Sequence, residues 1–583
     1  MRSAFFALTV LLFLCSCDHT LDSNDFETVY EKSDFVETAT YDEVIEWWQK
    51  LDKASPYLSI ATVGETDAGL PLHLIVISPS KNFSPQKLRE KGKTILLINN
   101  GIHPGESDGI DASMLFARDL LSDPDFESNY QNTVFLFIPI YNVGGALNRN
   151  CCTRANQNGP AEYGFRGNAR NLDLNRDFIK CDSKNAKAFN ALFTTWNPDV
   201  YLETHVSNGA DYQYTMTYLF SHPDKLTPAL SDFTKQNMIP TLAEKMVAAN
   251  EEMIPYVNVF GTSPDSGYQG FYDTPRYSTG YTALHNSIGL LTETHMLKDY
   301  KRRVEATHTF IHQLADFVNT NGESIKSARN LAAEQTLQQT DFPLDWKVDE
   351  EHSQPLVFKG FEAYYDTSEV TSQLQLYYDR SKPWRKEITY FNQLLATKTV
   401  KAPSFYLLPV GWSEAVDLLQ NNGVKMTLID QDSTLDMVAY EIDDFKTVES
   451  PYEGHYLHKE TKVKSQYWSK SIRKNEYYLI DLNQAAKRYI IETLEPEGPD
   501  ALFNWNFFDE ILQQKEWFST YIFDPEAKAM LDQDEALRKS FETMKEDSTF
   551  VEDKFKQLYF LYRNSDHYER ERHMIYPVLR IES

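Results

Sequence analysis

Long hydrophobic runs are scarce in this sequence, although 42% of its 583 residues are hydrophobic and 13% are aromatic. The apolar run that follows Arg2 ends at Leu14, well short of the roughly 20 residues that a membrane-spanning helix needs. No later segment is apolar enough to cross a bilayer, so we expect the body of the protein to lie outside the membrane. The apolar content is sufficient for packed cores and argues against disorder, and the length predicts two or three domains.

The short N-terminal run has the shape of a signal peptide. It ends in Leu14-Cys15-Ser16-Cys17, which resembles a bacterial lipobox with Cys17 as the lipidated first residue of the mature chain. The protein would then be anchored by lipid in the bacterial cell envelope, on its periplasmic or cell-surface face. The alternative is a plain secretory signal, in which case Cys17 need carry no lipid.

Cysteine is also scarce, and only Cys151, Cys152 and Cys181 follow the signal region. Export permits a disulfide. Because adjacent cysteines rarely bridge each other, we expect any bridge to join Cys181 to Cys151 or Cys152 and to leave the third thiol free. A metal site made of these cysteines is an alternative, but other residues explain metal chemistry better.

Basic side chains are outnumbered, with 57 Lys and Arg against 85 Asp and Glu and a net charge of −28. This balance disfavours nucleic-acid phosphates or an anionic membrane face as the main partner. We therefore expect no nucleic acid partner, and membrane contact only through the lipid anchor. The oligomeric state is left open.

Strand-like and helical patterns alternate between about residues 40 and 320. Spacings of four, three and four residues predict one apolar helix face, and an Asp-Pro pair ends this helix. The face consists of Ile110, Met114, Ala117 and Leu121. Strands that are apolar on both faces and separated by helices indicate an α/β fold with a central mixed, largely buried sheet and helices on both faces. The strand-like runs include Leu72–Ile77, Thr94–Ile98 and Val134–Ile138.

The most informative motif follows the second of these runs. His103 and Glu106 lie three residues apart in a turn, where an imidazole and a carboxylate can bind one Zn²⁺ and leave room for a third ligand and a water. Such sites lie beyond the carboxyl ends of the strands. His205, at the end of the β-prone run 200–204, fits the third ligand. Its competitors are His73, His222, His285 and His295.

An anion-binding motif lies between these candidate ligands. Asn175 and Arg176 are adjacent, a poor choice for a core. Their carboxamide and guanidinium groups can together grip a carboxylate.

These elements together resemble the zinc metallocarboxypeptidase family typified by carboxypeptidase A. In the family's order they are His103-x-x-Glu106, Asp173 to Arg176, His205 and a late Glu293. The resemblance covers roughly residues 40 to 320, about half of the chain. It implies a zinc-dependent peptidase that hydrolyses C-terminal peptide bonds of peptides or proteins with a free C-terminus.

The resemblance also implies a role for each residue. One Zn²⁺ would be held by His103, Glu106 and His205. Asp173 would orient the first metal histidine and fix its tautomer. Asn175 and Arg176 would bind the C-terminal carboxylate of the substrate.

Glu293 would be the general base that deprotonates a zinc-bound water and passes the proton to the leaving amine. It ends the apolar run 288–291, where a carboxylate is costly without a partner. A salt bridge from Glu293 to Lys298 or Arg302 is the alternative explanation.

A further arginine should polarise the scissile carbonyl and stabilise the oxyanion. We assign this role to Arg154 from its position before the Asn-Arg pair. Arg149 and Arg166 remain alternatives.

The family's mobile tyrosine is assigned to Tyr277. It lies in the segment 270–281, whose glycines and proline indicate a loop suited to a flap over the site. Tyr272 and Tyr281 lie in the same segment and remain alternatives.

Two features leave the activity open. Asp177 follows Arg176, where many family members have Asn. This difference can alter the charge beside the pair that is expected to bind the substrate carboxylate. The family also includes amidase-like and peptidoglycan-cleaving members, so a murein peptide peptidase or amidase is an alternative. A surface lipoprotein that binds peptides or glycans with an inactive site is disfavoured, because no expected catalytic element is missing.

We divide the chain into five parts. They are a lipoprotein signal peptide (1–17), a tether (18–40), a zinc carboxypeptidase-like catalytic domain (41–320), a linker with a helix (321–342) and a smaller accessory C-terminal region of α/β or β-rich type (343–583). In the last part, residues 404–429 predict a strand, a helix and a strand. We expect this region to pack against the catalytic domain, with substrate docking as the alternative.

Overall fold

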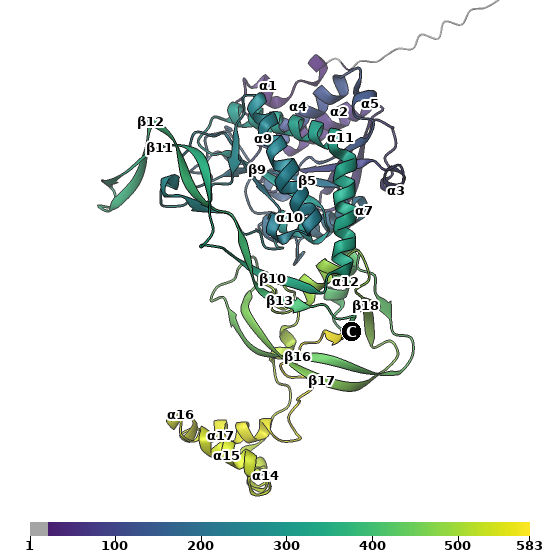
Figure 1. Ribbon diagram of the computed structural model, residues 1–583, viewed down its shortest axis with the longest axis vertical. Helices are drawn as coiled ribbons and strands as arrows, with labels where there is room; N and C mark the ends of the chain where they lie inside the picture. The colour runs from purple at the N-terminus through teal and green to yellow at the C-terminus, as the bar shows by residue number, and fades with distance from the viewer. Residues whose placement is uncertain (1–20, 22, 583) are drawn as a thin grey trace, which may run out of the picture.

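The computed structural model describes Leu21 and residues 23–582. Figure 1 shows an α/β body above a β-rich C-terminal region, from which a small group of helices extends at the bottom of the view. The predicted signal peptide and Cys17 lie outside the described residues. Within the described part of the chain, no helix combines the length and apolar character needed to span a bilayer.

A mixed eight-stranded sheet forms the centre of the body, in the order β1-β2-β4-β3-β5-β9-β6-β7. Its strands are β1 (Leu58–Glu65), β2 (Pro71–Ile77), β3 (Thr94–Asn99), β4 (Thr133–Ile138), β5 (Val200–Ser207), β6 (Met216–Phe220), β7 (Met253–Pro255) and β9 (Ile288–His295). The four central strands β4, β3, β5 and β9 are parallel to one another. Every residue of β3, β4 and β5 is buried, as expected for parallel strands covered on both faces.

Helices cover both faces of this sheet. The first face packs against α2 (Tyr41–Ala54), α4 (Asp108–Ser122), α9 (Ile239–Ala248) and α11 (Tyr300–Gln338). The second packs against α3 (Pro85–Glu90), α7 (Lys184–Trp196) and α10 (Ser278–Leu284). Side chains of β3 alternate between the two cores, with Leu96 in the first and Leu97 in the second. The predicted mixed, buried sheet with helices on both faces is therefore confirmed.

Shorter helices complete the body: α1 (Val29–Lys32), α5 (Phe126–Asn129), α6 (Val143–Leu147) and α8 (Pro228–Phe233). The long helix α11 continues from the body to the C-terminal region (Figure 1). Most of the segment 321–342, which we predicted as a linker with a helix, is the second half of α11.

The C-terminal region is built mainly from antiparallel strands. A hairpin of β11 (Gln354–Thr367) and β12 (Leu374–Phe391) extends beside the body in Figure 1, and β12 pairs with β8 (Tyr268–Gln269). A pair of strands, β10 (Asp341–Val348) and β13 (Leu394–Lys401), precedes the main sheet.

The main sheet of this region has the order β15-β18-β14-β19-β16-β17. Its strands are β14 (Phe405–Pro409), β15 (Thr427–Leu428), β16 (Ser433–Thr447), β17 (His458–Ile472), β18 (Tyr477–Asp481) and β19 (Leu579–Ile581). The helices are α12 (Ser413–Asn421), α13 (Lys487–Leu494), α14 (Thr520–Gln533), α15 (Glu535–Met544), α16 (Ser548–Val551) and α17 (Lys554–Arg563). The strand, helix and strand predicted within residues 404–429 correspond to β14, α12 and β15.

The core on the second face of the central sheet continues into the C-terminal region. Tyr201 of β5 and Tyr281 of α10 belong to the same buried cluster as Tyr489 of α13. The rings of Tyr281 and Tyr489 meet edge to face, with centroids 6.5 Å apart. The C-terminal region thus packs directly against the body and covers part of its core.

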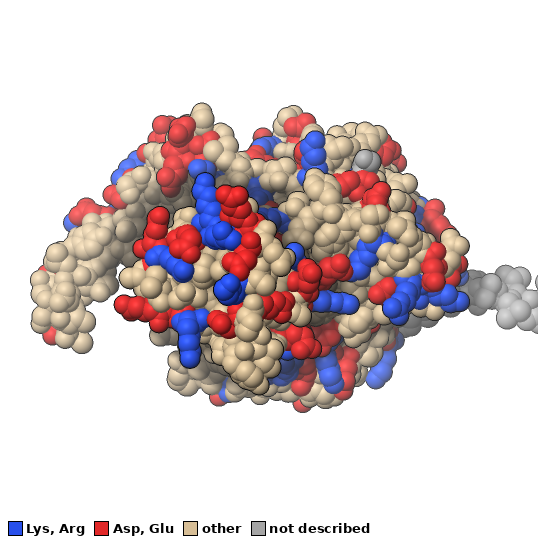
Figure 2. Space-filling model, turned by 90° about the horizontal axis from the view of Figure 1, so that it is seen from below, with Lys and Arg blue, Asp and Glu red and all other residues tan. Residues whose placement is uncertain are grey.

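The surface of this region carries both signs of charge. In Figure 2, which views the molecule from below, acidic and basic side chains lie interspersed over the visible face. No single-sign patch dominates that face.

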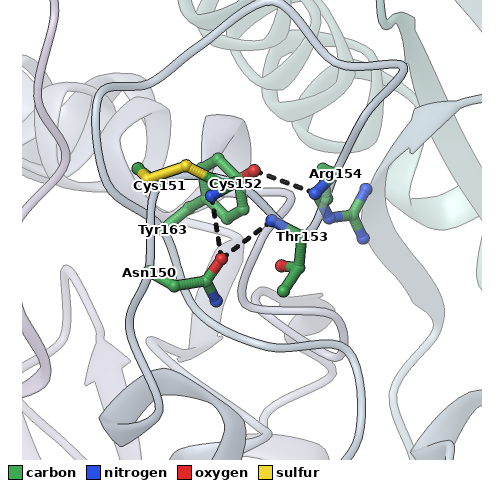
Figure 3. Close-up of a disulfide and its surroundings, with 6 residues drawn as sticks. All are labelled: Asn150, Cys151, Cys152, Thr153, Arg154 and Tyr163. Atoms are coloured by element: carbon green, nitrogen blue, oxygen red, sulfur yellow. Dashed lines mark hydrogen bonds between the residues drawn. A yellow bond between two sulfur atoms is a disulfide. The ribbon is translucent and has the colours of Figure 1, made fainter.

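The expected cysteine pairing is wrong. The structure has a disulfide between the adjacent Cys151 and Cys152 (Figure 3). Cys181 is free. The physical reason is location, because Cys151 and Cys152 lie in an exposed loop. Cys181 is only 2% exposed within the second core, with its sulfur 2.9 Å from the amide nitrogen of Asn190.

Candidate metal centre

The structure brings the three predicted zinc ligands together at the carboxyl ends of two neighbouring parallel strands. His103 and Glu106 lie in the turn after β3, and His205 lies in β5. The Nδ1 atom of His103 is 3.1 Å from Oε1 of Glu106, and Nδ1 of His205 is 3.0 Å from Oε2 of Glu106. A tetrahedral Zn²⁺ with bonds of about 2.0–2.1 Å has ligand atoms about 3.3 Å apart. The three buried side chains therefore fit this ion.

A carboxylate holds the far side of each imidazole. Asp173 Oδ1 is 2.9 Å from Nε2 of His103, and Glu203 Oε2 is 2.8 Å from Nε2 of His205. A proton on each Nε2 leaves the Nδ1 lone pair free for a metal, the usual arrangement of metal-binding histidines. The position of Asp173 agrees with the role that the family resemblance implied.

Sequence reasoning missed Glu203. This side chain is fully buried and accepts hydrogen bonds from the hydroxyls of Tyr201 (2.7 Å) and Ser278 (2.8 Å). Burial alone would raise its pKa, but the hydrogen bond and charge of His205 hold the pKa below its ordinary value. The signal was present in the strand pattern, because residues two apart in a strand share a face.

The groups around Glu106 stabilise the ionised form of its side chain. Burial alone would raise the pKa of Glu106, but the neighbouring His103 and Arg154 charges hold this pKa well below its ordinary value. Arg154 donates from Nη2 to Oε1 of Glu106 at 2.6 Å. Glu106 is therefore held in its ionised, metal-binding form.

This contact places Arg154 behind Glu106 and not among the residues that line the cavity. A second donation, from Nη1 to Gln157 at 2.9 Å, occupies the other end of its guanidinium. Figure 3 shows the loop that positions it, where the backbone N–H of Arg154 donates to the hydroxyl of Tyr163 at 2.9 Å. Arg154 is thus badly placed to polarise a substrate carbonyl, the role that we assigned to it.

Arg166, which we kept as an alternative, does line the cavity. Its Nε and Nη2 donate to Oδ2 of Asp173 at 3.0 and 2.8 Å. Its Nη1 is 3.8 Å from Oε1 of Glu106. This position beside the ligands suits a group that acts on a substrate carbonyl.

The predicted carboxylate-binding pair lines the same cavity, which has a volume of about 190 Å³. Among the described residues, the buried Oδ1 of Asn175 has no hydrogen-bond partner. The guanidinium of Arg176 lies over the ring of Tyr277, 4.5 Å from its centroid. Tyr277 lines the cavity immediately before α10.

The other tyrosines of this segment are engaged elsewhere. The hydroxyl of Tyr272 donates to Asp345 at 3.1 Å, and that of Tyr281 donates to Asn422 at 2.7 Å. Tyr256, which the sequence did not single out, also lines the cavity.

Asp177 is turned away from this cavity. Its buried carboxylate pairs with Lys180 at 2.7 Å and accepts from the hydroxyl of Ser183. The extra charge that departs from the usual family pattern is therefore neutralised within the fold.

Glu293 lines the cavity from β9. Within the described part of the chain, its buried Oε2 has no hydrogen-bond partner. Burial raises the pKa of Glu293 to about 7, although the charge of His205 opposes the shift. A buried carboxylate oxygen without a partner, beside three converging ligand atoms, fits a site that receives a metal ion and water.

The alternative ion pairs of Glu293 are not formed. Lys298 donates to the carbonyl oxygen of Tyr212 at 3.2 Å, and Arg302 pairs with Glu251.

Two residues of the C-terminal region reach this site. The hydroxyl of Tyr452 accepts a hydrogen bond from Nε of Arg176 at 3.1 Å. Glu453 accepts one from the backbone N–H of Asp173 at 2.7 Å. The C-terminal region therefore contacts Arg176 directly.

The four competing histidines lie outside the ligand group. His295 contacts Asp211 at 3.0 Å, and His73 lies 3.4 Å from the hydroxyl of Tyr41. His285 is half-buried, with its ring centroid 4.7 Å from that of Tyr281. His222 caps a short 3₁₀ turn through its own side chain.

Comparison with known proteins relates this part of the chain to a family. Residues 44–330 match the family model described as zinc carboxypeptidase. This segment, just under half of the chain, is therefore similar to zinc carboxypeptidases. No curated protein matches the chain.

Several solved structures resemble the chain at low identity. A metallo-carboxypeptidase from Burkholderia cenocepacia is 15% identical, with a TM-score of 0.37, over 49% of this chain and 70% of that one. A metallo-carboxypeptidase from Pseudomonas aeruginosa is 12% identical, with a TM-score of 0.38, over 49% and 70%. A carboxypeptidase A from Helicoverpa armigera is 14% identical, with a TM-score of 0.36, over 51% and 74%.

Proposed function

We propose that this protein is a zinc-dependent metallocarboxypeptidase that hydrolyses C-terminal peptide bonds of substrates with a free carboxylate. The family match over residues 44–330 supports the general class. The observation that carries the proposal is that the ligand group, Glu293 and the Asn175–Arg176 pair all line one cavity. A protein that only binds peptides would not need this combination.

The metal would be held by His103, Glu106 and His205. Their donor set, two imidazoles and a carboxylate, is one that Zn²⁺ uses in hydrolytic enzymes. When bound, Zn²⁺ supplies a Lewis acid that polarises a carbonyl and lowers the pKa of water.

Substrate binding would depend on other residues that line the same cavity. Arg176 and the amide of Asn175 bind the terminal carboxylate, because a guanidinium and an amide can donate to both of its oxygens. Tyr277 stacks on Arg176 and restricts its movement. Arg166 donates to the oxygen of the scissile carbonyl as negative charge develops there.

Glu293 would act as the general base. Its carboxylate accepts a proton from the attacking water and returns it to the nitrogen of the leaving amine. Its position in the cavity with the three ligand residues would let it act on a water held there.

The test is hydrolysis of a mixed peptide pool in free-acid and C-terminally amidated forms by the chain from Asp18 onward, followed by mass spectrometry. Loss of single C-terminal residues from free acids only, abolished by a zinc chelator, is expected. Equal cleavage of both forms would remove the carboxylate role of Asn175 and Arg176. Cleavage of peptidoglycan fragments alone would favour the murein peptidase or amidase.

We also propose that the mature chain begins at a lipidated Cys17 and is held in the bacterial cell envelope. The support is the sequence Leu14 to Cys17, which resembles a lipobox. Cys17→Ser should abolish incorporation of labelled fatty acid and release the protein from membrane fractions. Membrane association that survives this change would contradict the anchor.

A further inference from the structure

A second cluster of potential metal ligands lies on the first face of the central sheet. His308 and His312 are one turn apart on α11, so their side chains lie on the same side of the helix. They face Asp119 of α4, against which α11 packs. None of the three residues lines the cavity described above.

The ligand atoms converge. Nε2 of His308 is 3.0 Å from Oδ2 of Asp119 and 3.2 Å from Nε2 of His312. Nε2 of His312 is 3.7 Å from the same Oδ2. These separations surround the value of about 3.3 Å between the ligands of a tetrahedral Zn²⁺.

The arrangement is held by neighbouring packing. The ring of His312 meets Phe116 edge to face, with centroids 4.7 Å apart and an angle of 77°. Phe116 is fully buried in the core beneath α4. The two imidazoles are themselves nearly perpendicular, at 81°.

The local charge suits a cation. Arg118 pairs with Glu31 at 2.7 Å and lies 3.5 Å from Oδ1 of Asp119. Oδ2 of Asp119 therefore faces the histidines alone. Burial would raise the pKa of Asp119, but hydrogen bonds from the two imidazoles hold it below its ordinary value.

Solvent can reach the cluster. The side chains of Asp119, His308 and His312 are 38%, 25% and 34% exposed. A metal ion can enter without opening the fold, and water can complete its coordination.

We propose that Asp119, His308 and His312 form a second metal site, which takes a divalent transition-metal ion such as Zn²⁺ and joins α11 to α4. Two imidazole ligands favour zinc, cobalt, nickel or copper over magnesium and calcium, which prefer oxygen. The site is independent of the one proposed for hydrolysis. Its role is to fasten the long helix that connects the body to the C-terminal region.

The test measures the metal content of the chain from Asp18 onward, after chelation, dialysis against Zn²⁺ and removal of free metal. Two zinc ions per chain are expected for the wild type by elemental mass spectrometry. His312→Asn and Asp119→Asn should each retain one, bound at the first site. His205→Asn should also bind one zinc ion, in this case at the second site. The double variant with both His205→Asn and His312→Asn should bind none.

Comparison of these variants tests the second metal site separately from the proposed hydrolytic function. His352→Asn, which changes an exposed histidine outside both clusters, should leave two ions. If His205→Asn binds no zinc, or if His312→Asn and Asp119→Asn bind as much as the wild type, the second site is overturned. If the wild type and His205→Asn each bind one ion and His312→Asn binds none, the second site stands and the first fails.

A second measurement does not depend on counting ions. Zn²⁺ should raise the thermal midpoint of His205→Asn, because a ligand that binds only the folded state stabilises it. The same addition should leave the midpoint of His205→Asn with His312→Asn unchanged. Equal shifts in the two variants would overturn the proposal.

Discussion

His205 and Glu293 lie directly opposite each other in the register of the parallel strands β5 and β9. Their side chains therefore lie side by side on the same face of the sheet. His205 places an imidazole in the ligand group, and Glu293 places a half-buried carboxylate in the cavity. The distance between His205 and Glu293 is therefore set by the pairing of two strands and not by flexible loops.

Glu293→Gln should retain zinc and lose turnover. The amide keeps the shape of the side chain but cannot accept the proton, so kcat should fall by about 10²–10⁴. Zinc content and peptide hydrolysis measured on the same preparation check this, with the exposed Glu334→Gln as control. A variant that retains both metal and full activity would exclude Glu293 as the base.

Arg176→Ala should weaken binding of free-acid substrates selectively. A charge-assisted hydrogen bond to a carboxylate contributes about 1.5–3 kcal/mol, so KM for free acids should rise by about 10- to 100-fold. Arg170→Ala is the control, because Arg170 donates instead to the carbonyl oxygen of Asp182. If both changes affect KM equally, Arg176 is not the specific carboxylate receptor.

Glu203→Gln should weaken zinc binding without a direct contact to the metal. The amide no longer offers a charged partner to Nε2 of His205, and loss of such a partner costs about 10- to 100-fold in metal affinity. Competition with a chromogenic chelator measures the affinity. Asp173→Asn should behave similarly through His103, and an unchanged affinity in both variants would contradict this account of the carboxylates.

Asp111→Asn should increase stability more at pH 8 than at pH 5. Burial raises the pKa of Asp111 to about 7, against about 3.9 in an unfolded chain. The native state thus keeps a proton that the unfolded state releases, and this contribution to stability is lost as pH rises from about 4 through 7.

The structure makes this substitution conservative. Thr38 and Tyr300 both donate to Oδ2 of Asp111, and within the described part of the chain Oδ1 has no partner. An amide can keep the accepting oxygen and place its NH₂ at Oδ1. The gain should be larger at pH 8 than at pH 5 by about 2.5 kcal/mol, measured by denaturant unfolding. A gain independent of pH would show that Asp111 does not titrate in this range.

The central sheet and most of the site could be predicted because their signals are local. The buried strands β3, β5 and β9 are short apolar runs, and each delivers its polar residue at or just after its end. Glu203 could also have been predicted, since it shares a strand face with His205. A single carboxylate in an apolar run, however, does not show which residue it pairs with.

Other features depend on contacts that sequence patterns do not contain. The loop that carries Arg154 and Arg166 has no periodicity, so spacing could not tell which arginine enters the cavity. Tyr452 lies 276 positions from Arg176, and its contact exists only through tertiary packing. The cysteine pairing failed because the sequence did not reveal that Cys181 is buried in the core.

The contact of Tyr452 with Arg176 has a consequence for how this protein can be divided. The segment that matches the family model ends at residue 330, within α11, while a hydrogen-bond partner of Arg176 and part of the second core come from residues beyond 400. The unit that folds and the segment that matches the family model therefore have different boundaries. A fragment that ends at residue 330 would expose apolar core and leave Arg176 without its contact to Tyr452.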